Sequence, residues 1–170
     1  LGPLVPNISA RLETADDMLD LAPQAFVDDL PRLLEFAPAT DPKYPLQMIG
    51  RRQVRSHNSW TQNSPRLVKG RNRCTLEIHP KDAAALGIAE ASDVRVRSAV
   101  GEVIMPAEIT ENMAPGAVSI PQGWGQKNGR ISVATAQPTV SINDLTDDSR
   151  IDPISGNAAF NGVPVAVQPA

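Results

Sequence analysis

The sequence is short of cysteine, of aromatic residues and of long apolar runs. Its single cysteine, Cys74, excludes an intrachain disulfide and any metal or iron–sulfur site built from several cysteines. Cys74 lies in an apolar strand pattern, which indicates a buried structural thiol. Aromatic residues make up 4% of the chain, so the core must consist of Val, Ile, Leu and Ala. No apolar run approaches the length of a membrane span.

Carboxylates are missing from one long stretch, residues 48–75. That stretch holds seven Lys and Arg residues, so it carries +7 in a chain whose net charge is −3. The mild negative charge of the whole chain argues against a general nucleic-acid binder. A local charge of this size indicates either a solvated basic loop or a site for an anion.

The first part of this stretch, residues 48–63, has the side chains that a phosphate site requires. It follows an apolar run at 45–49 that predicts a short strand, which we expect to end at Gly50. Arginine side chains can bind a phosphate through two parallel hydrogen bonds, and Ser and Asn add further donors. Trp60 offers a flat face for a ring. These neighbours favour a phosphate-bearing ligand over a solvated loop.

The rest of the chain indicates one mainly-β domain. Sixteen prolines and eleven glycines imply many turns and short elements rather than a helical bundle. Alternating apolar residues and turn signals predict a closed barrel. The expected strands are 45–49, 76–78, 94–97, 103–109, 117–120 and 162–167, with a helix at 80–86, and a strand or extended loop at 131–142.

Residues 1–44 differ in composition, and we predict an N-terminal arm or linker that is partly helical, followed by a barrel domain at 45–170. Acidic residues outnumber basic ones in this arm by eight to three. A helix is expected to open at Pro23 with an apolar face, and Pro31 must kink or split it. The segment between Pro38 and Pro45 is predicted to be a linker. The arm docks either on neighbouring domains or on its own barrel, and the second is slightly favoured.

Several stretches, in order, are similar to one known family. They are Gly50-Arg51-Arg52 with Ser56 to Trp60, then 74–80, 82–87, 93–98, Pro121-Gln-Gly-Trp-Gly125, 143–146, 152–157 and 161–165. Together they resemble the C-terminal molybdopterin dinucleotide-binding domain of bis-molybdopterin guanine dinucleotide oxidoreductases, which include formate dehydrogenases and nitrate reductases. The resemblance covers residues 46–167. The sequence departs from it at Gln122, where many members have His, and at the polar stretch 126–130.

The resemblance implies a six-stranded double-psi β-barrel with short helices, whose ligand-facing loops cluster at one end. It implies a domain that holds bis-molybdopterin guanine dinucleotide with molybdenum (or tungsten) for redox chemistry done in the full-length enzyme. The implied cofactor-binding residues are Arg52, Ser56, His57, Asn58, Ser59, Gln122, Gly123, Trp124, Asn143, Asp144 and Asn161. The metal ligand is expected outside this chain, so no catalytic or metal-binding residue is assigned.

The resemblance also sets expectations for partners and activity. The other domains of a parent oxidoreductase and the cofactor are the expected partners, and neither nucleic acid nor membrane is expected. The isolated chain should show no turnover and should bind the cofactor weakly, so the cofactor is expected to be absent from it.

Local alternatives remain for individual residues. Trp124 can instead be a hydrophobic plug at the barrel end, and Asn143 with Asp144 can be simple turn residues. His79 is interpreted as a local hydrogen-bonding residue, since no second ligand lies at metal-binding spacing.

Two other functions stay open. One is a stand-alone interaction or nucleic-acid-binding module that uses residues 48–75. The other is a small barrel enzyme, although the sequence shows no Ser-His-Asp or Cys-His pairing at defensible spacing.

Overall fold

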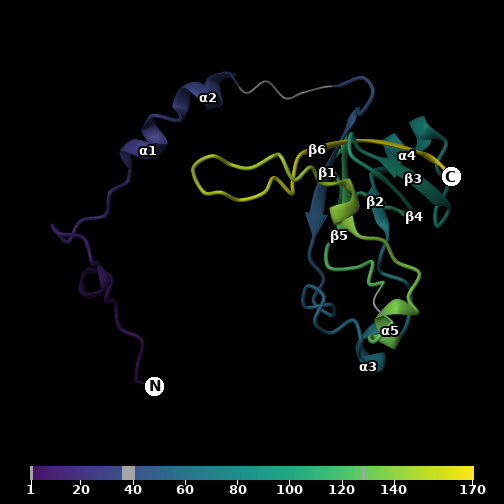
Figure 1. Ribbon diagram of the computed structural model, residues 1–170, viewed down its shortest axis with the longest axis horizontal. Coiled ribbons are helices and arrows are strands. Elements are labelled where there is room, and N and C mark those ends of the chain that lie inside the picture. Colours follow the sequence, from purple (N-terminus) through teal and green to yellow (C-terminus); the bar gives the residue numbers. More distant parts are fainter. Residues whose placement is uncertain (1, 36–40, 128) are drawn as a thin grey trace. The chain divides into compact units, whose positions relative to one another are not determined.

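The structure is a computed structural model that describes residues 2–35, 41–127 and 129–170 (Figure 1). The chain divides into two compact units, Leu1–Pro38 and Ala39–Ala170. The predicted division into an arm at 1–44 and a barrel domain at 45–170 stays a prediction, and part of the predicted linker, 36–40, lies outside the described residues.

The described part of the first unit contains three short helices: η1 (Ser9–Arg11), α1 (Gln24–Val27) and α2 (Leu30–Glu35). The predicted split of the apolar helix is confirmed, because α1 ends before Pro31 and α2 begins one residue ahead of it. Proline has no N–H to donate, so it is tolerated in the first turn of a helix and not in its interior. Helical spacing predicts one apolar face of Phe26, Leu30, Leu33 and Leu34. The first three line one hollow, whereas Leu34 is exposed and does not line it.

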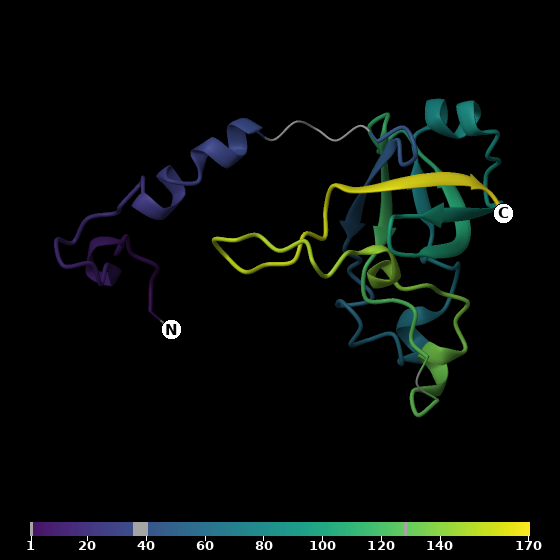
Figure 2. The same cartoon turned by 45° about the horizontal axis from the view of Figure 1, so that its top comes forward.

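The second unit is a closed barrel of six strands, which confirms the expected fold class (Figures 1 and 2). The strands are β1 (Leu46–Arg51), β2 (Leu76–Ile78), β3 (Asp93–Arg97), β4 (Glu102–Ile109), β5 (Ala117–Pro121) and β6 (Val163–Pro169). They pair in the order β1-β5-β2-β4-β3-β6 around the barrel. The pairs β1–β5 and β2–β4 are parallel and the other four are antiparallel.

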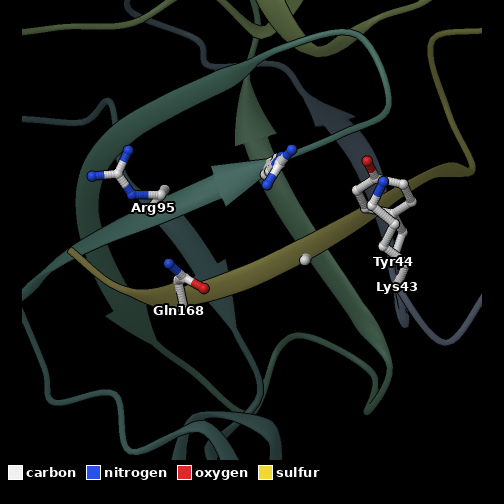
Figure 3. Close-up of a pocket in the computed structure, with 6 residues that line it drawn as sticks. Lys43, Tyr44, Arg95 and Gln168 are labelled. Carbon is white, nitrogen blue, oxygen red and sulfur yellow. The ribbon is translucent and has the colours of Figure 1, made fainter.

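Aliphatic side chains fill the barrel, as the scarcity of aromatic residues predicted. Successive side chains of a strand point to opposite faces, so Val94 and Val96 face inward while Arg95 faces outward (Figure 3). The residues that are fully buried include Met48, Leu76, Ile78, Val94, Val96, Val118, Ile120 and Val165.

The predicted helix after β2 is confirmed as α4 (Pro80–Leu86). His79 caps its start: the Nδ1 atom accepts a hydrogen bond from the Lys81 N–H at 3.0 Å, which confirms the local role predicted for this histidine. Gly87 ends the helix in the left-handed conformation, with φ of 69°. Among the described residues, no helix has the length and apolar character needed to cross a bilayer.

Of the two alternatives expected at 131–142, the strand is wrong, and the loop holds only for residues 138–141. That segment forms the short helix α5 (Ser132–Thr135) and leads into the 3₁₀ helix η2 (Ile142–Leu145). Asn63, in the loop before α3 (Pro65–Val68), accepts hydrogen bonds from the N–H groups of Val133 and Ala134 at 3.0 and 3.2 Å. Those groups are left unpaired at a helix start, so a distant asparagine supplies the cap that Ile131 cannot.

The predicted end of the first strand at Gly50 is also wrong. β1 continues through Gly50, which pairs with Ile120, to Arg51, which pairs with Pro121. The Gly50 N–H donates a hydrogen bond to the Asn161 Oδ1 atom at 2.8 Å. A glycine inside a strand marks a place where another part of the chain approaches closely, and here that part is Asn161.

Candidate functional site

The two parallel strands β1 and β5 end side by side, at Arg51 and Pro121. The next residues along the chain, Arg52 and Gln122, therefore begin two loops at the same end of the barrel. In Figures 1 and 2 these loops, with α3 and α5, lie beyond the tips of the β1 and β5 arrows. Loops held on a rigid scaffold are the usual location of binding residues.

These two loops contact each other directly. The Gln122 N–H donates to the Arg51 carbonyl oxygen at 2.9 Å, and the Gln122 amide donates to Asn58 Oδ1 at 3.1 Å. Gly123, with φ of 84°, packs so closely that an ideal Cβ atom would lie within 3.0 Å of the Asn58 carbonyl and the Ser59 nitrogen. Only glycine fits at 123, because of both its backbone angle and this contact.

The loop after β5 also contacts the segment that leads into η2. The Gly125 N–H donates to Thr139 Oγ1 at 3.1 Å, and the Gly125 Cα packs against the Ser141 backbone. Ser141 Oγ accepts the N–H of Asn143 at 3.2 Å, which fixes the turn that carries Asn143 and Asp144. Together with the bond between Asn161 and Gly50, these contacts bring all four predicted turns to one end of the barrel.

Most of the predicted residues are accessible at this end. Arg52, His57, Asn58, Ser59, Asn143, Asp144 and Asn161 are exposed, and Gln122 and Gly123 are half-buried. Within the described part of the chain, no carboxylate pairs with Arg52. Lys127 lies 4.0 Å from the Asp144 carboxylate.

The turn at 57–59 has an unusual backbone. His57 and Asn58 both have positive φ, 41° and 59°. The N–H groups of His57, Asn58 and Ser59 donate a hydrogen bond to no other described residue. Successive N–H groups without a protein acceptor can form a concave site for an anion, and exposed arginines precede this turn at 52 and 55.

Two predicted residues lie inside the structure. Ser56 is 3% exposed, and its hydroxyl donates to the Gln53 carbonyl oxygen at 3.0 Å, so it shapes the turn. Trp124 is 6% exposed and belongs to the apolar core, as the plug alternative predicts. Its buried Nε1–H has no partner among the described residues. Buried N–H groups are rarely left unpaired, and the plug role alone does not explain why this one is.

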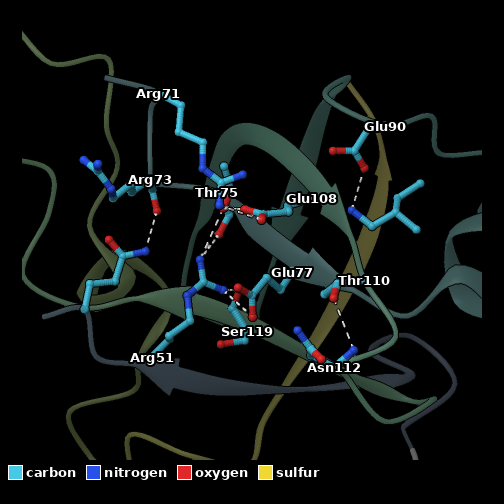
Figure 4. A network of polar contacts seen from close by, with 12 residues as sticks. Arg51, Arg71, Arg73, Thr75, Glu77, Glu90, Glu108, Thr110, Asn112 and Ser119 are labelled. Carbon is cyan, nitrogen blue, oxygen red and sulfur yellow. Dashed lines mark hydrogen bonds and ion pairs between the residues drawn. The ribbon is translucent and has the colours of Figure 1, made fainter. Parts of the chain in front are cut away.

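Sequence reasoning missed Arg51, whose guanidinium joins three strands (Figure 4). The side chain is 15% exposed and pairs with Glu77 at 2.9 Å. It also donates to the Ser119 carbonyl oxygen at 3.3 Å and to the carbonyl and hydroxyl oxygens of Thr75 at 3.0 and 3.2 Å. The sequence does contain a signal for this role. If the strand is continued through Gly50, the alternation of side chains places Arg51 and Arg52 on opposite sides of the chain.

The Arg51 network extends to a second ion pair. Thr75 donates its hydroxyl proton to Glu108 at 2.8 Å, and Glu108 pairs with Arg71 at 3.3 Å (Figure 4). Arg51 and Arg71 are therefore committed to carboxylates within the barrel wall. Arg52 and Arg55, by contrast, are exposed, and neither pairs with a described carboxylate.

Cys74 is buried and unpaired, which confirms the structural role predicted for it. Its thiol donates to the Val140 carbonyl oxygen at 3.6 Å, and burial raises the pKa of the thiol. In the described ranges, no three His, Cys, Asp or Glu residues cluster closely enough to hold a metal ion.

Comparisons with known proteins identify the family. The family model of the Molydopterin dinucleotide binding domain matches residues 46–164. Trimethylamine-N-oxide reductase of Haemophilus influenzae is 36% identical over 91 residues, which are 52% of this chain and 11% of that protein. The F420-dependent formate dehydrogenase 1 subunit alpha of Methanococcus maripaludis is 30% identical over 99 residues, 57% of this chain and 15% of that protein.

A solved structure shows the same fold. Acetylene hydratase from Pelobacter acetylenicus superposes with a TM-score of 0.63 at 19% identity, over 85% of this chain and 20% of that one. This chain thus spans a small part of the length of the relatives it matches. With the family model covering most of the sequence and the barrel confirmed, the chain belongs to the molybdopterin dinucleotide-binding domains of bis-molybdopterin guanine dinucleotide oxidoreductases.

Proposed function

We propose that this chain holds the bis-molybdopterin guanine dinucleotide of a molybdenum (or tungsten) oxidoreductase through the four turns at one end of its barrel. The observation that carries the proposal is the 57–59 turn, whose three N–H groups have no acceptor among the described residues and which shares a loop with the exposed Arg52. Backbone donors and a guanidinium suit the phosphates that join a pterin to a guanosine. The absence of carboxylates from 48–75 keeps this rim positive.

The other turns offer groups that suit the flat edges of a heterocycle. Asn161 already uses its Oδ1 atom to accept the Gly50 N–H, so its amide NH₂ is left to donate to a ligand. Asp144 is a carboxylate that can accept two N–H bonds from a guanine edge. Asn143 can both donate and accept. The residues present therefore fit the cofactor that the family implies.

The role of the protein in this proposal is to bind and orient. The cofactor, when bound, supplies the redox centre, and the protein supplies position and electrostatics. The contact of Gly123 with Asn58 holds the loop after β5 against the 57–59 turn, so both face the ligand as one surface. Trp124, the next residue along, lies in the core, and its indole N–H is buried and unpaired among the described residues. The metal ligand is assigned to another part of a parent enzyme, whose other domains are the proposed partners.

The test is to substitute Arg52 by alanine in a full-length oxidoreductase that carries this chain. We expect retained molybdenum and pterin to fall about tenfold, because one charge-assisted phosphate contact is lost. Metal content is measured by mass spectrometry and pterin by fluorescence after oxidation. Arg66→Ala is the matched control, since Arg66 is equally exposed on α3 and lies outside the four turns. Unchanged metal and pterin in the Arg52 variant would show that its phosphate role is wrong.

A further inference from the structure

A polar hollow lies on the outer wall of the barrel, over β3 and β6 (Figure 3). Its volume is about 190 Å³, and it is lined by Lys43, Tyr44, Arg95, Arg97, Ala166 and Gln168. None of the eleven predicted cofactor-binding residues lines it. A water molecule occupies roughly 30 Å³ in the liquid, so the hollow has room for a small hydrated ligand.

Strand register explains why the wall is hollowed at this point. β3 and β6 are antiparallel neighbours, with Arg97 opposite Ala166 and Arg95 opposite Gln168. All four residues lie on the outward face, because the valines between them are buried. The methyl group of Ala166 is too short to fill the space between the longer side chains, and it forms the floor.

Three cationic side chains, Lys43, Arg95 and Arg97, surround this floor. Arg95 pairs with Glu102 at 2.5 Å, so its charge is largely balanced. Arg97 forms no ion pair with a described carboxylate, although Glu102 lies opposite it in the β3–β4 register. The Lys43 ammonium lies 5.2 Å from the centre of the Tyr44 ring, and the nearby Asp41 carboxylate accepts the Lys43 N–H at 2.8 Å. Asp93 faces outward on the same strand, but it lies beyond Arg95, on the side away from Arg97. No carboxylate is among the lining residues.

The available donors select the ligand class. A guanidinium matches the geometry of an oxyanion, and an ammonium and an amide supply further N–H donors. The Tyr44 ring is buried and Lys43 covers it, so no open aromatic face is left for a base or another ring. We propose that this hollow binds a small oxyanion, a phosphate or a carboxylate group, through Arg97, Lys43 and Gln168.

The test is a nuclear magnetic resonance titration of the full 170-residue chain. Sodium phosphate and sodium acetate are added in separate arms at constant ionic strength, with sodium chloride as reference. We expect saturable amide shifts at 43–46, 95–97 and 166–168 with at least one of the two oxyanions. The stronger arm identifies the source, free phosphate or a carboxylate. Shifts at these residues that match those in chloride would overturn the proposal.

Two variants test the hollow in different ways. Arg97→Gln removes the free guanidinium, and we expect it to weaken binding about tenfold. Ala166→Leu fills the floor without changing charge and should abolish the shifts, which keeps the test valid if one variant fails to fold. Arg66→Gln makes the same charge change as Arg97→Gln at a distant exposed site and should leave binding within twofold.

The result is separable from the proposed cofactor function. Binding that survives both variants, or phosphate shifts confined to the 57–59 turn, would overturn the oxyanion hollow and leave the cofactor proposal standing. Conversely, a loss of metal and pterin in the Arg52→Ala variant does not test oxyanion binding in the hollow, because Arg52 does not line it.

Discussion

Substitution of Gly123 by alanine should lower the free energy of unfolding by about 3 kcal/mol, because it combines backbone strain with a steric clash. The new Cβ atom would lie within 3.0 Å of the Asn58 carbonyl, and the φ of 84° is unfavourable for any residue with a side chain. The loop after β5 must move away from the 57–59 turn. Urea unfolding followed by circular dichroism measures the loss.

Gly116→Ala is a matched control for this substitution. Gly116 has nearly the same φ, 82°, but a Cβ atom there would meet nothing within 4 Å. Its cost should be the backbone strain alone, about 1 kcal/mol. The difference between the two variants measures the contact between the turns. Equal losses would mean that the turns do not press on each other, and the site would lose the contact that joins two of its four parts.

Substitution of Arg51 by methionine should cost about 3 kcal/mol, because it removes the donor to the half-buried Glu77 carboxylate and to the carbonyl oxygens of Ser119 and Thr75. The aliphatic stem of methionine keeps most of the packing, so the loss reports the polar contacts. Arg51→Lys should recover only part of it, since an ammonium cannot reproduce the fork of the guanidinium.

Arg52→Met, one residue along, is the control. Arg52 is exposed, and no described carboxylate pairs with it, so its loss should change the free energy of unfolding by less than about 0.5 kcal/mol. Adjacent arginines would then have separate roles, one in holding the barrel and one in holding a ligand. A large loss for Arg52→Met, or none for Arg51→Met, would contradict that division.

Local signals in the sequence predicted the regular parts of the fold. The alternation of Val94 and Val96 with arginines, and the His79-Pro80 start and Gly87 end of α4, depend on residues within a few positions of each other. The helix α5 could not be predicted this way. Its cap is Asn63, which is 70 positions away from Val133 in the chain, so no local window contains the interaction.

Only part of the candidate site could be predicted from the sequence. Composition predicted a phosphate-binding stretch at 48–63, but only the family resemblance implied that four separated turns would meet. Gly50 was taken as a strand end, which hid the alternation that assigns Arg51 to the wall and Arg52 to solvent. The burial of Ser56 and Trp124 depends on long-range packing, and their proposed contacts with the cofactor stay predictions.

The most direct test is an experimental structure of a full-length enzyme carrying this chain, isolated with its cofactor. We predict that a phosphate of the dinucleotide accepts hydrogen bonds from the backbone N–H groups of 57–59 and from Arg52, and that Asn143, Asp144 and Asn161 contact the same cofactor. A cofactor bound at the other end of the barrel, or one whose phosphates avoid the 57–59 turn, would contradict the proposed site.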